Sequence, residues 1–200
     1  MRMVKRSVVV ICEGKTEWHY IDSLRVHKRY RFTLKPSLAK HTDVHAIQKK
    51  VENALKTAGK SDYVICLMDA DRLGQYEKEN EKYERMIRKL RKRKNFIPIR
   101  TYPCLEFWFL LHFSPGGKLY YNSDSVVKDL QAYIPDYEKT DEYLSKNNLY
   151  RLLEDRLPQA MERAKRLCNI PEDERICYSE VFKLLELLET LGAAEGQPPE

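Results

Sequence analysis

The sequence predicts an α/β fold in which helices flank a mostly parallel four-stranded sheet, with a helical cap towards the C-terminus. Apolar, β-branched runs alternate with amphipathic stretches as far as Phe113, which is the pattern of parallel strands joined by right-handed helical crossovers. Pro115–Gly117 interrupts the alternation, and only helical patterns follow it. We therefore expect a sheet domain over residues 1–121, a helical cap over 122–191 and a disordered tail over 192–200.

The strands are expected at four segments. Ser7–Ile11 and Asp62–Met68 are continuous apolar runs rich in β-branched residues, as is typical of central strands buried on both faces. Tyr30–Pro36 alternates between polar and apolar residues, and Phe96–Thr101 supplies the fourth strand.

Helices are expected between and after these strands. Thr16 is a suitable N-cap for the first helix. Thr42 or Asp43 is a suitable N-cap for the second helix. The second helix places Val44, Ile47 and Val51 at helical spacing. The predicted helices of the sheet domain are Thr16–Arg29, Asp43–Ala58, Tyr76–Lys94 and Cys104–Phe113, and those of the cap are Ser123–Tyr133, Leu149–Cys168 (interrupted by Pro158) and Ser179–Leu191.

Composition excludes several classes of protein. The longest apolar runs are Val8–Cys12 and Val64–Met68, far short of the roughly 20 residues that span a bilayer, so no membrane partner is expected. The five cysteines are an odd number and include no Cys-x-x-Cys pair, which argues against a zinc ribbon and a disulfide framework. A cytoplasmic protein with reduced thiols is expected.

The charge is distributed unevenly. Residues 1–121 hold 26 basic and 13 acidic side chains, whereas residues 122–200 hold 10 and 17. Seven of the ten residues in Arg85–Lys94 are Lys or Arg, and none is acidic. Such a run predicts a polyanionic partner, nucleic acid above all, although it can also be a solvated helix face. The residues expected to contact phosphates here are Arg88, Arg91, Lys92, Arg93 and Lys94.

Carboxylates follow the predicted strand ends. Glu13 follows the first strand, Asp69 and Asp71 follow the third, and Glu106 follows the fourth. The carboxyl ends of parallel strands meet at one sheet edge, where α/β proteins bind ligands. Oxygen ligands of this kind favour Mg²⁺ or Mn²⁺. We expect Glu13, Asp69 and Asp71 to hold the metal and Glu106 to complete the catalytic set.

Other residues near these acids have weaker signals. Gly14-Lys15-Thr16 resembles part of a phosphate-binding loop, but that motif requires a glycine where this chain has Val9. Gly14 is instead expected to permit a tight turn that leaves helix amides free for an anion, and Lys15 to contact phosphate. Arg72 is expected either to hold a phosphate or to pair with a carboxylate.

Two further residues are expected to support the site from outside the metal's ligand set. Glu17 is either such a supporting acid or a favourable charge in the first turn of its helix. His112 is either a structural histidine or a proton shuttle.

The order and spacing of these segments resemble the RloB-like (AbiLii-type) family. The resemblance extends over almost the whole chain to about Leu191. The segments that carry it are Glu13-Gly14-Lys15-Thr16-Glu17, Asp69-Ala70-Asp71-Arg72, Pro103-Cys104-Leu105-Glu106-Phe107-Trp108, Leu111-His112-Phe113, Tyr137-Glu138-Lys139 and the helix around Ala160–Ala164.

The resemblance implies a Toprim-like domain, the metal-dependent catalytic fold also found in primases, topoisomerases and some nucleases, and a setting in prokaryotic defence or restriction. It implies that Glu13 is the Toprim glutamate and that Asp69 and Asp71 form its Asp-x-Asp pair. The Thr101-Tyr102 pair departs from the polar Ser-Asn-like pair expected before Pro103, so substrate contacts of that loop do not carry over.

The leading hypothesis is therefore a Mg²⁺-dependent nuclease that cleaves phosphodiester bonds of DNA or RNA. Glu13 acts in it as a metal ligand or as a general base, and the sequence does not choose between these roles. Two alternatives stay open: a non-catalytic module that binds nucleic acid or a protein partner of a defence system, and a metal-dependent nucleotidyl- or glycosyltransferase.

Overall fold

A five-stranded sheet forms the centre of the computed structural model, which describes residues 6–39, 43–60, 62–70, 77–172 and 174–194. The strand order is β2-β1-β3-β4-β5. The first four strands are parallel, and β5 is antiparallel to β4. The strands are β1 (Ser7–Cys12), β2 (Thr33–Leu38), β3 (Tyr63–Asp69), β4 (Phe96–Tyr102) and β5 (Tyr178–Ser179).

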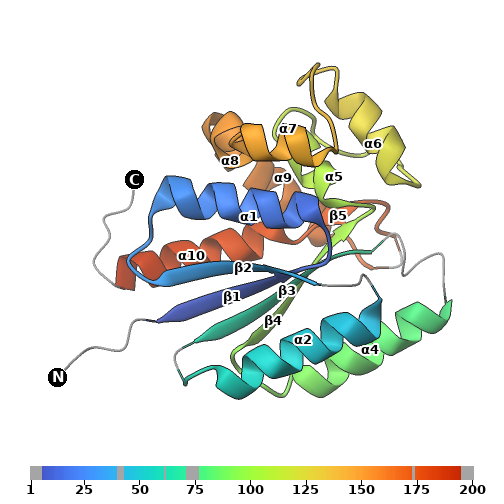
Figure 1. Cartoon of the computed structure of the whole chain (residues 1–200). Coiled ribbons are helices and arrows are strands. Elements are labelled where there is room, and N and C mark those ends of the chain that lie inside the picture. Colours follow the sequence, from blue (N-terminus) through green and yellow to red (C-terminus); the bar gives the residue numbers. More distant parts are fainter. Residues whose placement is uncertain (1–5, 40–42, 61, 71–76, 173, 195–200) are drawn as a thin grey trace.

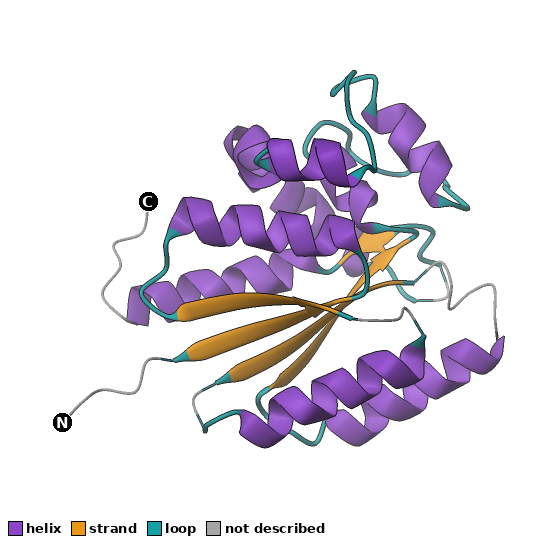
Figure 2. Ribbon diagram, in the orientation of Figure 1, coloured by secondary structure: helices purple, strands orange, loops and turns teal. Residues whose placement is uncertain are grey.

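Helices cover both faces of this sheet (Figures 1 and 2). α2 and α4 lie on one face, and α1 and α10 lie on the other (Figure 1). α7 and α8 pack against α1, α5 packs against β4 and β5, α9 packs against β5, and α6 packs against α5. The helices are α1 (Lys15–Lys28), α2 (Val44–Thr57), α4 (Glu77–Leu90), α5 (Leu105–Leu110), α6 (Ser123–Leu130), α7 (Asp141–Lys146), α8 (Leu149–Leu153), α9 (Leu157–Cys168) and α10 (Val181–Ala194). No described helix is both long enough and apolar enough to cross a membrane.

Two apolar cores, one on each face, explain why the central strands are apolar throughout. In β1, Val8 and Val10 face the core under α1, whereas Ile11 faces the core under α2 and α4. The larger core also contains cap residues such as Leu153, so the sheet and the cap helices pack around shared apolar side chains. Within it, the Trp108 indole N–H donates to the Tyr20 hydroxyl at 2.9 Å, which satisfies a polar group that burial would otherwise penalise.

The structure corrects the predicted elements at several places. The second strand is Thr33–Leu38, shifted from the predicted Tyr30–Pro36. The sheet has a fifth strand, Tyr178–Ser179, which at two residues is too short for any periodicity to reveal. The helix Asp141–Lys146 was also not predicted; its N-cap is Thr140, whose hydroxyl accepts the Tyr143 N–H. Residues 192–194 complete α10, so the prediction of disorder is wrong for them, while residues 195–200 lie outside the described residues. The domain division at residue 121 stays a prediction.

Candidate active site at the carboxyl edge of the sheet

The structure brings the predicted acids of the first, third and fourth strands to one edge of the sheet. β1 and β3 are parallel neighbours, with Cys12 opposite Leu67, so Glu13 and Asp69 emerge side by side. β4 continues the parallel array and leads into α5, whose first turn carries Glu106. Glu13 and Glu106 are buried, and Asp69 is partly buried.

Glu106 is the most enclosed acid of this group, with a side chain that is 0% exposed. Its Oε1 accepts hydrogen bonds from the Tyr137 hydroxyl at 3.1 Å and the Thr16 hydroxyl at 3.4 Å. The Lys139 ammonium lies 3.1 Å from the same oxygen. Oε2 is buried and has no hydrogen-bond partner among the described residues. One oxygen is therefore held by three donors, whereas no hydrogen bond to the other is made by the described residues.

Glu17 lies inside the cluster. Its Oε2 accepts the Gly14 N–H at 3.1 Å, and Gly14 is the N-cap of α1, so the prediction that Thr16 caps this helix is wrong. The expected role of Gly14 is also corrected, because its φ of −122° is an ordinary extended value and its amide is taken by Glu17. A Cβ at Gly14 would lie 2.8 Å from Glu17 Oε2, so glycine is needed here to admit the carboxylate.

Burial and neighbouring carboxylates raise the pKa of two acids of the site, Asp69 and Glu17. Burial raises the pKa of Asp69 well above its usual value, and the charges of Glu17, Glu106 and Glu13 raise it further. The Thr101 hydroxyl opposes this effect by donating to Asp69 Oδ1 at 2.8 Å. Burial and then Glu106 raise the pKa of Glu17 in the same way. The site thus holds more negative charge than its protein surroundings neutralise, which is the electrostatic condition for binding a cation.

The cation that lies among these acids is Lys139. Burial opposes its charge, but the neighbouring Glu106, Cys104 and Asp69 together outweigh burial and raise the pKa of Lys139 above its ordinary value. Lys139 therefore stays protonated and balances one carboxylate of the group.

Glu17→Gln should make the metal-free protein more stable at neutral pH. The folded-state pKa of Glu17 is raised, so folding costs free energy wherever this carboxyl must ionise, and that cost grows as the pH rises from about 4.5. Gln removes the charge and can still accept the Gly14 N–H. Thermal melts in EDTA between about pH 5 and 8 measure this effect. At pH 8 the melting temperature of the mutant should exceed that of the wild type by roughly 2–4 °C, which corresponds to about 1 kcal/mol. The difference should shrink towards pH 5. A mutant that melts below the wild type at pH 8 would contradict the pKa assignment.

The donor set suits a hard divalent cation but is incomplete in the described part of the chain. Asp71 and Arg72 lie outside the described residues. Within those residues no group of three or more His, Cys, Asp or Glu side chains is placed to hold a metal ion. Glu13 and Asp69 nevertheless supply two carboxylates at one edge, and the bare Oε2 of Glu106 belongs to the same electrostatic cluster. Carboxylate oxygens are the ligands that Mg²⁺ and Mn²⁺ prefer.

Lys15 makes a contact other than the one expected from the sequence, whereas His112 fits one of its two expected roles. Lys15 pairs with Asp141 of α7, so its described partner is an acid of the cap. The Nδ1–H of His112 donates to the carbonyls of Trp108 and Phe109, at 3.0 and 3.2 Å. Burial lowers the pKa of His112 to about 4. This histidine is therefore neutral at pH 7 and anchored to the backbone of α5, which agrees with the structural alternative.

Comparison with known families settles the relationship of the chain. Residues 8–188 match the model of the RloB-like protein family. The chain belongs to this family. No curated protein and no solved structure matches it. The match spans the sheet, the acids at its edge and nearly all of the cap, so it covers every residue of the candidate site in this RloB-like protein.

Three residues that contact acids of the site were not predicted to belong to it: Tyr137, Lys139 and Thr101. Tyr137 and Lys139 belong to the loop before α7, and both meet Glu106. Thr101 belongs to β4 and meets Asp69. The Tyr137-Glu138-Lys139 segment was a signal that could have identified two of them, because it is part of what resembles the RloB-like family.

The basic run of this RloB-like protein does not lie with the acids. Arg88 is on α4, near its end, and Arg91–Lys94 are exposed in the turn that follows. This turn precedes the amino end of β4, where the Val64 N–H donates to the Asn95 carbonyl at 2.8 Å. The length of β4 therefore separates the run from the carboxyl edge, and at about 3.3 Å per residue this is roughly 20 Å. The basic run and the acids therefore cannot act on the same phosphate group.

Replacing Arg91, Lys92 and Arg93 with Glu should still weaken nucleic-acid binding if the run contacts the backbone. Each phosphate contact adds about −0.9 to the slope of log affinity against log salt on duplex, so the mutant slope should be flatter by about 2–3. Titrations at several salt concentrations measure this. Unchanged affinity and slope would show that the run is a solvated face.

Proposed function

We propose that this RloB-like protein is a Mg²⁺- or Mn²⁺-dependent nuclease that hydrolyses phosphodiester bonds. The observation that carries the proposal is the convergence of Glu13, Glu17, Asp69 and Glu106 at the carboxyl edge of the sheet, where burial and neighbouring carboxylates raise the pKa of Asp69 and of Glu17. Buried carboxylates that repel one another are costly for folding, and a cation bound for catalysis explains why such a cluster exists. The defence setting implied by the family resemblance belongs to the same proposal.

The roles follow from the contacts of each residue. Glu13 and Asp69 would hold the cation, with Asp71 as the third ligand by its position in the sequence. When bound, the metal supplies Lewis-acid stabilisation of the attacking and leaving oxygens. Thr101 orients the Asp69 carboxylate through its hydrogen bond. Tyr137, Thr16 and Lys139 fix Glu106 through Oε1, which leaves Oε2 for a ligand or for the water that attacks. Glu13 remains a candidate for either metal ligand or general base.

The test is turnover of nucleic acid by the purified wild-type protein. Labelled single- and double-stranded DNA and RNA are incubated with Mg²⁺, with Mn²⁺ and with EDTA. We expect cleavage that requires the cation and that is lost in Glu13→Gln and Glu106→Gln proteins of normal thermal stability. Equal cleavage by wild type and both variants would indicate a contaminating nuclease and would remove the proposal.

The placement of the basic run favours one alternative, a module that binds nucleic acid without cleaving it. The exposed cations of Arg91–Lys94 lie at the sheet edge opposite the acids, so they can bind a phosphate backbone independently of any chemistry. Salt-dependent binding that is lost on reversing these charges, together with no cleavage under any cation, would select this alternative.

A further inference from the structure

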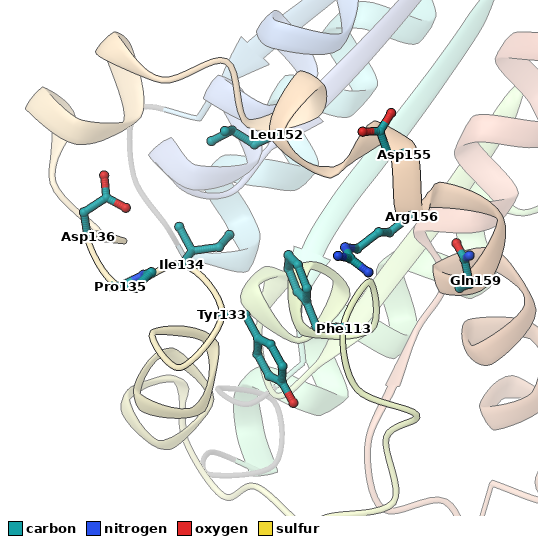
Figure 3. Close-up of a pocket in the computed structure, with 9 residues that line it drawn as sticks. All are labelled: Phe113, Tyr133, Ile134, Pro135, Asp136, Leu152, Asp155, Arg156 and Gln159. Carbon is teal, nitrogen blue, oxygen red and sulfur yellow. The ribbon is translucent and has the colours of Figure 1, made fainter.

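A pocket lies in the cap, apart from the acids. It has a volume of about 630 Å³ and opens between the turns that follow α5 and α6 and the α8–α9 junction (Figure 3). Two large apolar side chains on its walls are unusually exposed, Tyr133 at 49% and Leu152 at 52%. Exposed apolar surface in a concave site is characteristic of ligand binding.

The aromatic wall of this pocket is built for stacking. The Phe113 and Tyr133 rings are nearly parallel, with an interplanar angle of 11° and centroids 5.0 Å apart. The Arg156 guanidinium carbon lies 5.3 Å from the Phe113 centroid. Phe113 thus supports both Tyr133 and Arg156 from within, while Tyr133 keeps half of its surface open. Phe113 lies between Tyr133 and Arg156 (Figure 3), and the exposed ring of Tyr133 is the surface on which a flat ring system can stack.

The polar groups of the pocket suit the edge of such a ring. Asp136 and Asp155 line the pocket and can accept hydrogen bonds from the amino groups of a nucleobase. Arg156 lines it too and makes no ion pair with any described residue, so its donors are available for a base carbonyl or a phosphate.

The pocket is also linked to the acids by short stretches of chain. Asp136 directly precedes Tyr137, whose hydroxyl donates to Glu106. Phe113 lies seven residues after Glu106, on the far end of α5 and its following turn, which is roughly 10 Å at 1.5 Å per residue. A base held in the pocket therefore lies within a few nucleotides of a phosphodiester at the acids.

We propose that this pocket binds an unstacked base of a single-stranded segment of the nucleic-acid substrate, an inference that rests on the proposed nuclease function. Recognition of splayed bases on aromatic and arginine surfaces is the common mode for single strands. The pocket selects single-stranded or frayed nucleic acid, because a base paired within a duplex cannot present its face to Tyr133.

The experiment is binding of labelled single-stranded DNA and RNA of about 12 nucleotides, within the usual site size for single strands, in EDTA so that cleavage does not intervene. Tyr133→Ala should weaken binding about tenfold, since loss of one stacked base falls in that range, and Tyr133→Phe should restore affinity to within roughly twofold. Tyr121→Ala is the matched control: Tyr121 is 71% exposed and does not line the pocket. Arg156→Gln should also weaken binding, and duplex binding should change in none of these variants.

The outcomes separate this inference from the proposed function. Cleavage by the wild type combined with unchanged single-strand affinity in Tyr133→Ala would overturn the pocket assignment and leave the nuclease standing. Loss of affinity in Tyr133→Ala without cleavage under any cation would support the pocket and remove the nuclease. Equal losses in Tyr133→Ala and Tyr121→Ala, equal losses on duplex, or no binding by the wild type would overturn the pocket assignment.

Discussion

Asp69→Asn should reduce phosphodiester cleavage by about a thousandfold or more and at the same time make the metal-free protein more stable. The loss of activity follows from removing a charged metal ligand, because metal stabilisation of transition-state charge is worth several kcal/mol and each 1.36 kcal/mol is tenfold in rate. The gain in stability follows from the raised pKa of Asp69, since burial and the neighbouring Glu17 and Glu106 charges penalise its ionised form. Asn keeps the shape and can still accept the Thr101 hydroxyl.

Cleavage assays and thermal melts, with and without Mg²⁺, test both effects. The melting temperature in EDTA should rise by a few degrees, because about 1 kcal/mol moves it by roughly 2–4 °C at this size, and the stabilisation that Mg²⁺ gives the wild type should disappear. Asp22→Asn is the control: this carboxylate pairs with Arg25 on the surface of α1, and its loss should change neither property. Equal Mg²⁺ stabilisation of wild type and Asp69→Asn would place the metal elsewhere.

The four parallel strands could be predicted from the sequence because strands that are buried on both faces are apolar along their whole length. The predicted strand Ser7–Ile11 is Ser7–Cys12 in the structure, since continuous β-branched runs bounded by charge are typical of strands buried on both faces. The predicted Phe96–Thr101 is Phe96–Tyr102, although Pro98 and Arg100 interrupt its apolar pattern. The fifth strand has no such pattern in its sequence. It pairs Tyr178 and Ser179 with the end of β4, and pairing of two residues is decided by tertiary packing.

The acids were predictable from their places at strand ends, whereas the residues that hold them were not. Lys139 reaches Glu106 from 33 positions along the chain, a contact that only the packing of the cap creates. The central position of Glu17 could not be predicted for a different reason, because an acid is common in the first turn of any helix. The glycine that makes room for the Glu17 carboxylate also has the sequence pattern of an ordinary turn residue.

The basic run illustrates a limit of charge patterns. Its composition predicts a polyanionic partner, but composition does not show where in the fold the run lies. Because α4 runs antiparallel to the strands it connects, its C-terminal end and the turn after it lie at the amino edge of the sheet. The connectivity βαβ could have shown that Arg91–Lys94 and Asp69 belong to opposite edges.

Lys139→Met should lower the free energy of unfolding by about 2–3 kcal/mol. Breaking a buried ion pair from one side costs about 3–5 kcal/mol, since the remaining charge is left uncompensated. We expect the smaller loss of about 2–3 kcal/mol here, because the Lys139 side chain is 41% exposed, although Glu106 is fully buried. The melting temperature should fall by roughly 5–10 °C. Lys118→Met is the matched control, because Lys118 is 62% exposed and its pair with Asp129 at 2.6 Å lies on the surface, where such pairs are worth about 0–1 kcal/mol.

The double variant Lys139→Met/Glu106→Gln decides whether the loss comes from the stranded charge. Gln at position 106 can still accept the Tyr137 and Thr16 hydroxyls through its amide oxygen, but it carries no charge to be left unpaired. Its stability should therefore return most of the way to that of Glu106→Gln alone, which corresponds to a coupling energy of about 1–3 kcal/mol. If the two losses simply add, Lys139 contributes packing alone, and Glu106 does not depend on it as a counter-ion. Adding Mg²⁺ gives an independent readout: a cation bound beside Glu106 compensates the stranded carboxylate, so it should raise the melting temperature of Lys139→Met by more than that of the wild type.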